Sequence, residues 1–547
     1  MRPVGWLVLS VCLVGATACT GNAGGVIPLD SGVCTTCVPD GGNFNIFVVD
    51  PTPFSPPVDG GVVSSDGGTV QSSVTGYETI PLFQMHLAPN GNIGIAYVEF
   101  SADQTDNKPR PDPSLLNYDV LYTEWSPTTN SVALASPERV TGSFPVQNYV
   151  GVTLDYSNGQ AVVGLLGWTS APGYDATQAY WYQHQGVLAY RTANGAGPGT
   201  WTQVDAVDNG PAPGADPAAN GACAGNGSCV EGPITGLYPA VLVDGAETFF
   251  TVRNVHFGSS TGTGDFINSN FDLALGGPAT WQYFGLGWGK PGIQLDLSPS
   301  QPGVSRGCSI STNTPGRTAY GNHSRIILGY NNHPAIISDI GNNEYNSPGT
   351  DVLFFEQQDG GSWNCPMTIV TSADTSTTGN FPGNEQAMQE TSGPSIAYDS
   401  QGVGYAVSIS DISGSGAAYF KTCNPNADAG WGCVTNGHWT DFQPVFQSGS
   451  GGYFSSVALN PDTHDPWVAY YFCSSSPAYN EFSCPPLERQ LVVATSPNNI
   501  GIWYPQPVDT QGAWQTQMLY LTNPTRLVIG YRDPTTGVMK VAVENPE

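Results

Sequence analysis

The feature that most constrains the fold is a hairpin that recurs along the chain. Each copy consists of two short apolar strands around a tight polar turn, and the copies span 84–100, 149–168, 238–255, 325–340, 394–410, 453–472 and 518–533. Successive copies begin roughly 60 to 90 residues apart, which suits a four-stranded blade with loop insertions and is too long for a solenoid repeat. The pattern therefore predicts an all-β chain, a seven-bladed β-propeller of four-stranded antiparallel blades.

The composition agrees with short strands joined by many turns. The chain has 68 Gly and 45 Pro among 547 residues, whereas the residues that fill helix surfaces are scarce. Its formal net charge of −29 comes with no basic cluster. Because phosphate backbones are bound by clustered cations, we expect no nucleic-acid partner.

A second signature precedes the fourth strand of several repeats, where a small or polar residue is followed by tryptophan. The tryptophans are Trp201, Trp281, Trp363, Trp439 and Trp503. An indole at an equivalent place in several repeats can fill the wedge-shaped space between neighbouring sheets that diverge. We expect these side chains to pack between blades, and the alternative is that they stack on a ligand.

The two ends of the predicted ring should share one blade. The last repeat supplies three strands, 518–521, 527–531 and 538–543, before the sequence ends at Glu547. The segment Tyr77–Phe83 is available as the fourth strand. An N-terminal strand joining the C-terminal blade would remove the exposed sheet edges.

The first residues resemble a bacterial lipoprotein signal. Met1 and Arg2 precede an apolar run from Val4 to Ala18, small residues follow, and then comes Cys19. The resemblance implies that residues 1–18 are removed and that Cys19 carries the lipid, palmitate included. Thr20 after this cysteine implies sorting to the outer membrane, on its periplasmic face or at the cell surface.

Residues 19–75 form a Gly-, Pro- and Asp-rich segment. Such a composition buries too little apolar area to fold, so we expect a flexible tether between the lipid and a propeller of residues 76–547.

The remaining cysteines fit an oxidising compartment. Without Cys12 and Cys19 ten are left, an even number. Neighbours along the chain make the natural disulfides, which are Cys34–Cys37, Cys223–Cys229, Cys308–Cys365, Cys423–Cys433 and Cys473–Cys484, and the third pair is assigned by elimination.

Four acidic residues lie at or near the end of the second strand of a hairpin and should gather at one face of the ring. They are Glu99, Asp339, Asp411 and Asp533. Clustered carboxylates can bind a ligand or cation, or act as an acid–base pair. The alternative is that each caps the turn after its strand.

A loop in the sixth repeat places oxygen-bearing side chains at alternating positions, as calcium loops do. Its candidate ligands are Asn460, Asp462 and Asp465, although the glycine and distant glutamate of a helix–loop–helix site are missing. We expect no other cofactor. The seven histidines show no metal-binding spacing.

The tryptophan turns resemble degenerate Asp-boxes of the sialidase-like propellers, whose motif is Ser-x-Asp-x-Gly-x-Thr-Trp. The best copy is Ser496-Pro497-Asn498-Asn499-Ile500-Gly501-Ile502-Trp503, in which only Ser and Trp of the box remain. The resemblance implies the blade architecture. The arginine triad and Tyr-Glu pair of those enzymes cannot be placed on this sequence, and no Phe-Arg-Ile-Pro motif occurs.

Long insertions at 205–235, 284–323 and 413–438 are of a size usually kept for recognition. We therefore expect a lipid-anchored binding or scaffold propeller for an envelope protein or glycan rather than an enzyme. The alternative is a sialidase-like envelope glycan hydrolase or lyase. No catalytic residue is assigned.

Overall fold

The structure is a computed structural model of the chain. It describes residues 43–52, 83–100, 118–140, 151–168, 184–194, 197–207, 234–245, 247–258, 266–276, 282–284, 318–342, 350–357, 367–370, 393–410, 417–425, 432–434, 438–440, 443–446, 450–452, 455–474, 484–485, 487–499, 501–534 and 536–545. No helix in these ranges is both long enough and apolar enough to cross a membrane.

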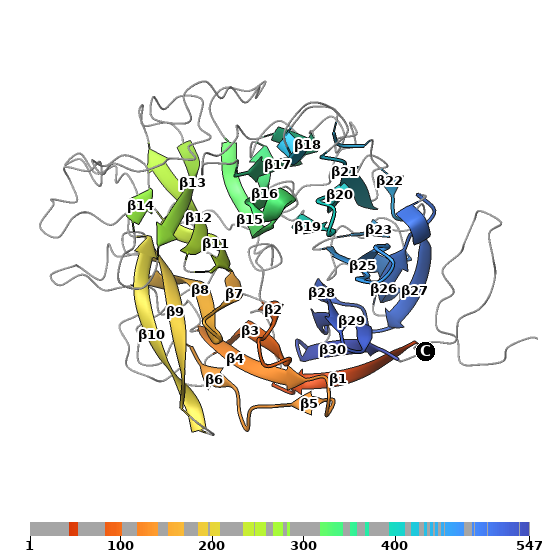
Figure 1. Cartoon of the computed structure of the whole chain (residues 1–547), viewed down its shortest axis with the longest axis horizontal. Helices are drawn as coiled ribbons and strands as arrows, with labels where there is room; N and C mark the ends of the chain where they lie inside the picture. Colours follow the sequence, from red (N-terminus) through yellow and green to blue (C-terminus); the bar gives the residue numbers. More distant parts are fainter. Residues whose placement is uncertain are drawn as a thin grey trace, which may run out of the picture.

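The described strands form seven antiparallel sheets that follow one another around a ring (Figure 1). The first sheet holds β2 (Phe83–Leu87), β3 (Ile93–Phe100), β4 (Tyr118–Ser126), β5 (Ser131–Val132) and β6 (Glu138–Arg139). The second holds β7 (Val152–Ser157), β8 (Gln160–Trp168), β9 (His184–Asn194) and β10 (Gly197–Val207). The third holds β11 (Ile234–Asp244), β12 (Glu247–Gly258), β13 (Phe266–Gly276) and β14 (Gln282–Phe284). The fourth holds β15 (Thr318–Leu328), β16 (Pro334–Asn342), β17 (Thr350–Glu356) and β18 (Met367–Val370).

The fifth sheet holds β19 (Ser395–Tyr398), β20 (Gly404–Ser410), β21 (Ala417–Cys423) and β22 (Gln443–Pro444). The sixth holds β23 (Ser450–Gly451), β24 (Ser456–Leu459), β25 (Pro466–Cys473), β26 (Arg489–Thr495) and β27 (Tyr504–Asp509). The seventh holds β28 (Trp514–Thr522), β29 (Thr525–Arg532), β30 (Met539–Glu544) and β1 (Phe44–Asp50). The described residues also include three short 3-10 turns, η3 (Tyr330–Asn332), η4 (Gly432–Val434) and η5 (Pro497–Asn499). The all-β propeller is thus confirmed, and most of its sheets have four strands.

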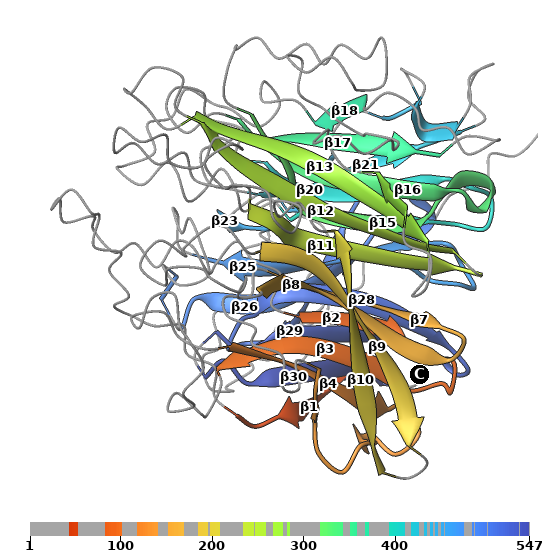
Figure 2. The ribbon, with the colours of Figure 1, turned by 90° about the vertical axis from the view of Figure 1, so that its left-hand side faces the viewer.

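Each hairpin predicted from the sequence is present. Seen from the side, the strands run from one face of the ring to the other (Figure 2). The β7–β8 turn shows how the local sequence makes a hairpin. Asn158 and Gly159 both have positive φ, 49° and 81°, between the paired residues Ser157 and Gln160. Two such residues form the type I′ turn whose twist matches the flanking strands.

The hydrophobic core is divided among the junctions between neighbouring sheets. One cluster joins the first and second sheets through Val98, Tyr122, Leu154 and Val163. Further clusters join the seventh sheet to the first, the sixth to the seventh, the fifth to the sixth and the fourth to the fifth. At these junctions the sheets are held together by apolar faces rather than by a single central core.

The tryptophan turns pack between sheets, as predicted. The indoles meet a ring on the third strand of the preceding sheet edge-on, a favourable geometry for aromatic pairs. The pairs are Trp201–Tyr122 at 5.4 Å, Trp439–Phe354 at 5.6 Å and Trp503–Phe420 at 4.8 Å between ring centroids. Trp281 and Trp363 lie outside the described residues.

The strand that closes the ring is not the predicted one. An N-terminal strand does join the C-terminal sheet, but it is β1, whose register runs from Phe44 opposite Glu544 to Asp50 opposite Met539. Phe83 instead begins β2, the innermost strand of the first sheet. The prediction of Tyr77–Phe83 was wrong, and residues 44–50 of the predicted tether belong to the propeller. Averaging composition over the whole tether hid the short apolar run Phe44-Asn45-Ile46-Phe47-Val48-Val49.

Two of the predicted disulfides are confirmed, Cys423–Cys433 and Cys473–Cys484. Each closes a short loop, with 10 and 11 residues of sequence separation. The cysteines of the other predicted pairs, and Cys19, lie outside the described residues.

Candidate functional site

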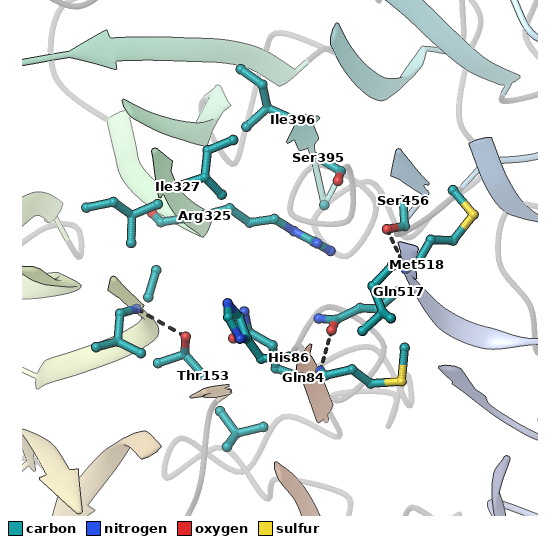
Figure 3. A pocket seen from close by; sticks show the side chains of 18 of the residues that line it. Gln84, His86, Thr153, Arg325, Ile327, Ser395, Ile396, Ser456, Gln517 and Met518 are labelled. Atoms are coloured by element: carbon teal, nitrogen blue, oxygen red, sulfur yellow. Dashed lines mark hydrogen bonds between the residues drawn. The ribbon is translucent and has the colours of Figure 1, made fainter. Parts of the chain in front are cut away.

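A cavity of about 290 Å³ lies at the centre of the ring (Figure 3). Its wall is built from β2, β7, β11, β15, β19, β24 and β28, one strand from every sheet. The propeller topology therefore brings seven segments far apart in the sequence to one site.

One side chain from each of these strands occupies an equivalent place in the wall, which we call the ring position. The ring-position residues are Gln84, Thr153, Ala240, Arg325, Ser395, Ser456 and Gln517. The strand register supports the equivalence. In three sheets the ring-position residue pairs with a residue of the second strand. That residue pairs in turn with the third-strand aromatic residue that contacts a tryptophan. The resulting rows are Gln84–Ala96–Tyr122, Arg325–Ile337–Phe354 and Ser395–Val407–Phe420.

Five ring-position side chains accept a hydrogen bond from a backbone N–H of the next inner strand. The bonds join Gln84 to Leu154 (3.0 Å), Thr153 to Val241 (3.1 Å), Ser395 to Val457 (3.3 Å), Ser456 to Met518 (2.9 Å) and Gln517 to Met85 (2.6 Å). Gln517 also donates through Nε2 to the carbonyl of Phe83 at 3.2 Å. These side chains link sheet to sheet around the inner wall and hold it in one arrangement.

Two ring positions depart from this pattern. Ala240 has no side-chain acceptor, and the guanidinium of Arg325 is a donor only. Both departures fall in the same sector of the wall, on β11 and β15. Figure 3 shows Arg325 extending into the cavity toward the side that carries Gln517 and Ser456.

The described residues that line the cavity include no Asp or Glu. This is notable in a chain with 44 acidic and 15 basic side chains. The lining has two side chains that carry or can carry positive charge, Arg325 and His86. The cavity thus has the opposite charge character from the chain as a whole.

A buried carboxylate, Asp155, lies two residues along β7 from the ring-position Thr153. Asp155 Oδ1 is 3.4 Å from Nε2 of the half-exposed His86, and Oδ2 accepts the backbone N–H of Val243 at 2.6 Å. Burial raises the pKa of Asp155, and His86 together with the N–H donors of Val243 and Tyr156 opposes that shift. The carboxylate therefore joins three neighbouring sheets and positions the imidazole.

The carboxylates predicted as a ligand site do not line the cavity among the described residues. Glu99 is buried at the end of β3, beside a network in which Tyr97 donates to Asp50 at 2.6 Å. Arg532, fully buried, donates to the carbonyls of Gly537 at 2.9 Å and of Val98. Burial lowers the pKa of Arg532 to about 10, against the opposing effect of Glu99 and Asp50. This network joins the seventh sheet, through β1 and β29, to β3 of the first sheet.

Asp533 forms a structural contact of its own. Its Oδ2 lies 2.5 Å from Nζ of Lys540, and its Oδ1 accepts the backbone N–H of Thr536 at 2.9 Å. The bond from Thr536 caps the turn after β29. Turn capping was the alternative to ligand binding predicted for Asp533. Asp339 lies in β16, opposite Asn322 and Val352, and its side chain is not among those described. Asp411 lies outside the described residues.

The oxygens of the predicted calcium loop take part in a turn. Asn460 Oδ1 accepts the N–H groups of Asp462 at 2.9 Å and Thr463 at 3.2 Å. Asp465 accepts the Thr463 hydroxyl at 2.7 Å and the Asn498 N–H at 2.5 Å. In the part of the chain that the structure describes, no three His, Cys, Asp or Glu side chains are grouped to hold a metal. Calcium at this loop stays a prediction.

The ring-position residues were not predicted from the sequence. A signal does exist in some hairpins, because β19 and β24 each carry one small polar side chain, Ser395 and Ser456, among apolar ones. Their convergence could not be inferred, because the alternation of polar and apolar residues along a strand does not say which face of the strand points toward the axis of the ring.

The chain matches no protein-family model and no curated protein. Among solved structures it is similar to Trypanosoma rangeli sialidase in complex with sialic acid, at 12% identity and a TM-score of 0.37, over 75% of this chain and 55% of the sialidase. It is also similar to a variant of NanB sialidase from Streptococcus pneumoniae, at 11% identity and a TM-score of 0.40, over 86% of this chain and 69% of that protein. The match spans little more than half of the trypanosomal enzyme, and no activity or site residue is transferred from these likenesses.

Proposed function

We propose that the protein is a lipoprotein anchored to the outer membrane through Cys19, whose propeller acts as a binding or scaffold module for an envelope protein or glycan. In this proposal each of the seven sheets is one blade. The proposed flexible tether begins at Cys19 and ends before β1 rather than at residue 75, because Phe44–Asp50 pairs with β30.

The observation that carries the proposal is the central cavity. Its wall takes one strand from each sheet, and inter-sheet hydrogen bonds hold five of the ring positions in place. A preformed concave site with a few convergent polar groups is the usual form of a ligand site. A rigid wall also favours binding, because little side-chain entropy remains to be lost.

The alternative is an envelope glycan hydrolase or lyase, and one observation favours it. His86 and Asp155 form a half-exposed imidazole backed by a buried carboxylate, an arrangement able to move a proton. A glycosidase of the usual kind needs two carboxyl groups about 5 to 10 Å apart across the scissile bond. The described lining residues supply none, which supports binding over hydrolysis.

The test is affinity capture of the tagged, lipid-bearing protein from solubilised envelopes, with mass spectrometry of what is retained, run with and without a calcium chelator. A reproducible protein or glycan partner is the expected result. If no partner is recovered and the protein turns over members of a glycan panel, the binding proposal is wrong and the hydrolase or lyase is supported. Loss of capture with chelator would support the calcium site at Asn460, Asp462 and Asp465.

A further inference from the structure

We propose that a second copy of this chain pairs with the outer edge of β1, so that two propellers join through one continuous sheet. The inference goes beyond the proposed function and does not rest on it. It follows from the backbone groups that β1 directs outward, from the side chains that it exposes and from the order of its residues.

β1 is the outermost strand of the seventh sheet and, within the described part of the chain, pairs with β30 alone (Figure 1). The Asn545 N–H donates to the carbonyl of Asn43 at 2.7 Å. In an antiparallel pair, residues that bond to the partner strand alternate with residues whose N–H and C=O point away from it. Asn43 is of the first kind, so every second residue after it bonds to β30. The residues that direct their backbone groups away from β30 are Phe44, Ile46 and Val48.

This outer edge lacks the features that usually protect an edge strand. Proteins commonly protect such edges with proline, with lysine, with a bulge or by keeping the strand short. β1 has seven residues, none of them proline, and no charged residue from Phe44 to Val49. Its register with β30 is uninterrupted from Phe44 to Val48. The exposed fractions of the aliphatic residues Ile46 and Val48 are 41% and 52%.

Other described outer strands differ from β1 in these respects. β27 carries Pro505 and Pro507, which cannot donate a hydrogen bond. β5, β6, β14, β18 and β22 have two to four residues each. β10 is longer, but it exposes the polar side chains of Thr200 and Thr202. The exposed apolar edge is therefore a particular feature of β1 rather than a consequence of the propeller fold.

The three outward residues make β1 complementary to itself. When two copies meet antiparallel about a two-fold axis at Ile46, Ile46 of one copy faces Ile46 of the other, and Phe44 faces Val48. Each such pair exchanges two hydrogen bonds, so the outward backbone groups of both strands are satisfied. The paired side chains are all apolar, which favours packing across the strands. A symmetric contact of this kind closes on itself and gives a dimer rather than a fibre.

Charge also favours a second copy as the occupant. The stretch from Phe44 to Val49 has no charged side chain, so no like charges face each other across the axis. A basic partner strand would find no carboxylate in this stretch to recognise. The net charge of −29 opposes self-association, but charges further away are screened beyond about 8 Å at physiological ionic strength. A contact of one strand pair is small beside the roughly 1,200 Å² of a stable interface, so we expect a weak, concentration-dependent dimer.

The first test is disulfide crosslinking of the full lipid-bearing chain in detergent, with micelles in excess over protein. Ile46→Cys places two thiols at the axis, within reach of a disulfide, so oxidation should give a covalent dimer. Val48→Cys is the matched control. Val48 is the more exposed of the two residues, yet the proposed pairing holds its two copies about 13 Å apart along the strands. The parent chain reports any crosslinking through the native cysteines.

The second test is sedimentation velocity over a concentration series. Ile46→Lys should raise the dissociation constant of the dimer about tenfold or more, because two lysines would face each other at the axis. Leu487→Lys adds the same charge outside β1, at a residue that is 90% exposed, and should associate like the parent. Thermal unfolding of each variant verifies that it is folded.

The inference is wrong if the parent stays monomeric up to about 0.1 mM, if both cysteine variants crosslink equally, or if a folded Ile46→Lys variant associates like the parent. Hydrogen exchange then identifies another occupant. Protection of the outward Ile46 amide in a monomeric parent would show that a segment of the same chain covers the edge, and this too overturns the pairing of copies. Capture of an envelope partner bears on the proposed function alone.

Discussion

Gln517 should be the side chain on which closure of the inner wall depends most. It links the last sheet to the first with two hydrogen bonds, accepting the Met85 N–H at 2.6 Å and donating to the Phe83 carbonyl at 3.2 Å. Gln517→Ala leaves both backbone groups without this partner. A buried polar group left unsatisfied costs about 1 to 3 kcal/mol. Because Gln517 lines a cavity that water can enter, the lower end of that range applies to each group, and we expect a total loss of about 2 kcal/mol.

The assay is urea unfolding followed by tryptophan fluorescence, since Trp125 is buried in the cluster between the first and seventh sheets. Native-state hydrogen exchange adds a local readout. The amide of Met85 should exchange about 30-fold faster in the variant, because about 1.4 kcal/mol corresponds to tenfold. Gln506→Ala is the matched control, since Gln506 accepts an exposed hydrogen bond from Asn43. A loss for Gln517→Ala no larger than the control, with Met85 exchange unchanged, would refute the linking role.

Three further results are expected. Glu138→Gln should lower the free energy of unfolding at pH 7 by about 2 to 3 kcal/mol, because Glu138 is buried and accepts two bonds from Arg191, at 2.7 and 2.8 Å. Burial raises the pKa of Glu138, but Arg191 and nearby N–H donors outweigh it and hold that pKa below its usual value. The contribution of Glu138 to stability is therefore complete above the unfolded pKa of about 4.3 and is lost as the pH falls through the folded pKa. Urea unfolding should separate parent and variant at pH 7 and bring them together in acid. Replacing both Cys423 and Cys433 by Ala should cost about 2 to 3 kcal/mol in thermal or urea unfolding, as loop entropy predicts for a separation of 10 residues. Ala240→Ser should add the missing link to β15 and raise stability by about 0.5 to 1.5 kcal/mol in the same measurement.

Each of these has a contrary outcome. A Glu138→Gln penalty that is the same in acid as at pH 7 would show that charge on this carboxylate is not what stabilises the junction. An unchanged unfolding midpoint after loss of the Cys423–Cys433 disulfide would mean that its loop is already ordered without it. A destabilised Ala240→Ser variant would show that the wall at β11 is closed by packing and has no room for the hydroxyl.

The hairpins and the tryptophan turns could be predicted because their causes are local. A two-residue turn such as Asn158-Gly159 needs positive φ at both positions, which few residues tolerate, so the turn is visible in the sequence. Apolar runs on either side then predict the paired strands. The Cys423–Cys433 and Cys473–Cys484 disulfides were also within reach, because their partners are neighbours along the chain.

The closing strand and the cavity wall depend on contacts between distant segments. Phe44–Asp50 gains its stability by pairing with β30, almost 500 residues away, and its short apolar run does not say which strand it pairs with. Likewise a polar side chain in an inner strand looks the same in the sequence whether it faces solvent, a neighbouring sheet or the axis. Sequence alone therefore determined that the chain is a ring of hairpins wedged apart by tryptophans. Only the tertiary structure decided that one strand of every sheet meets the others around a central cavity, because that wall exists only once every sheet is in place.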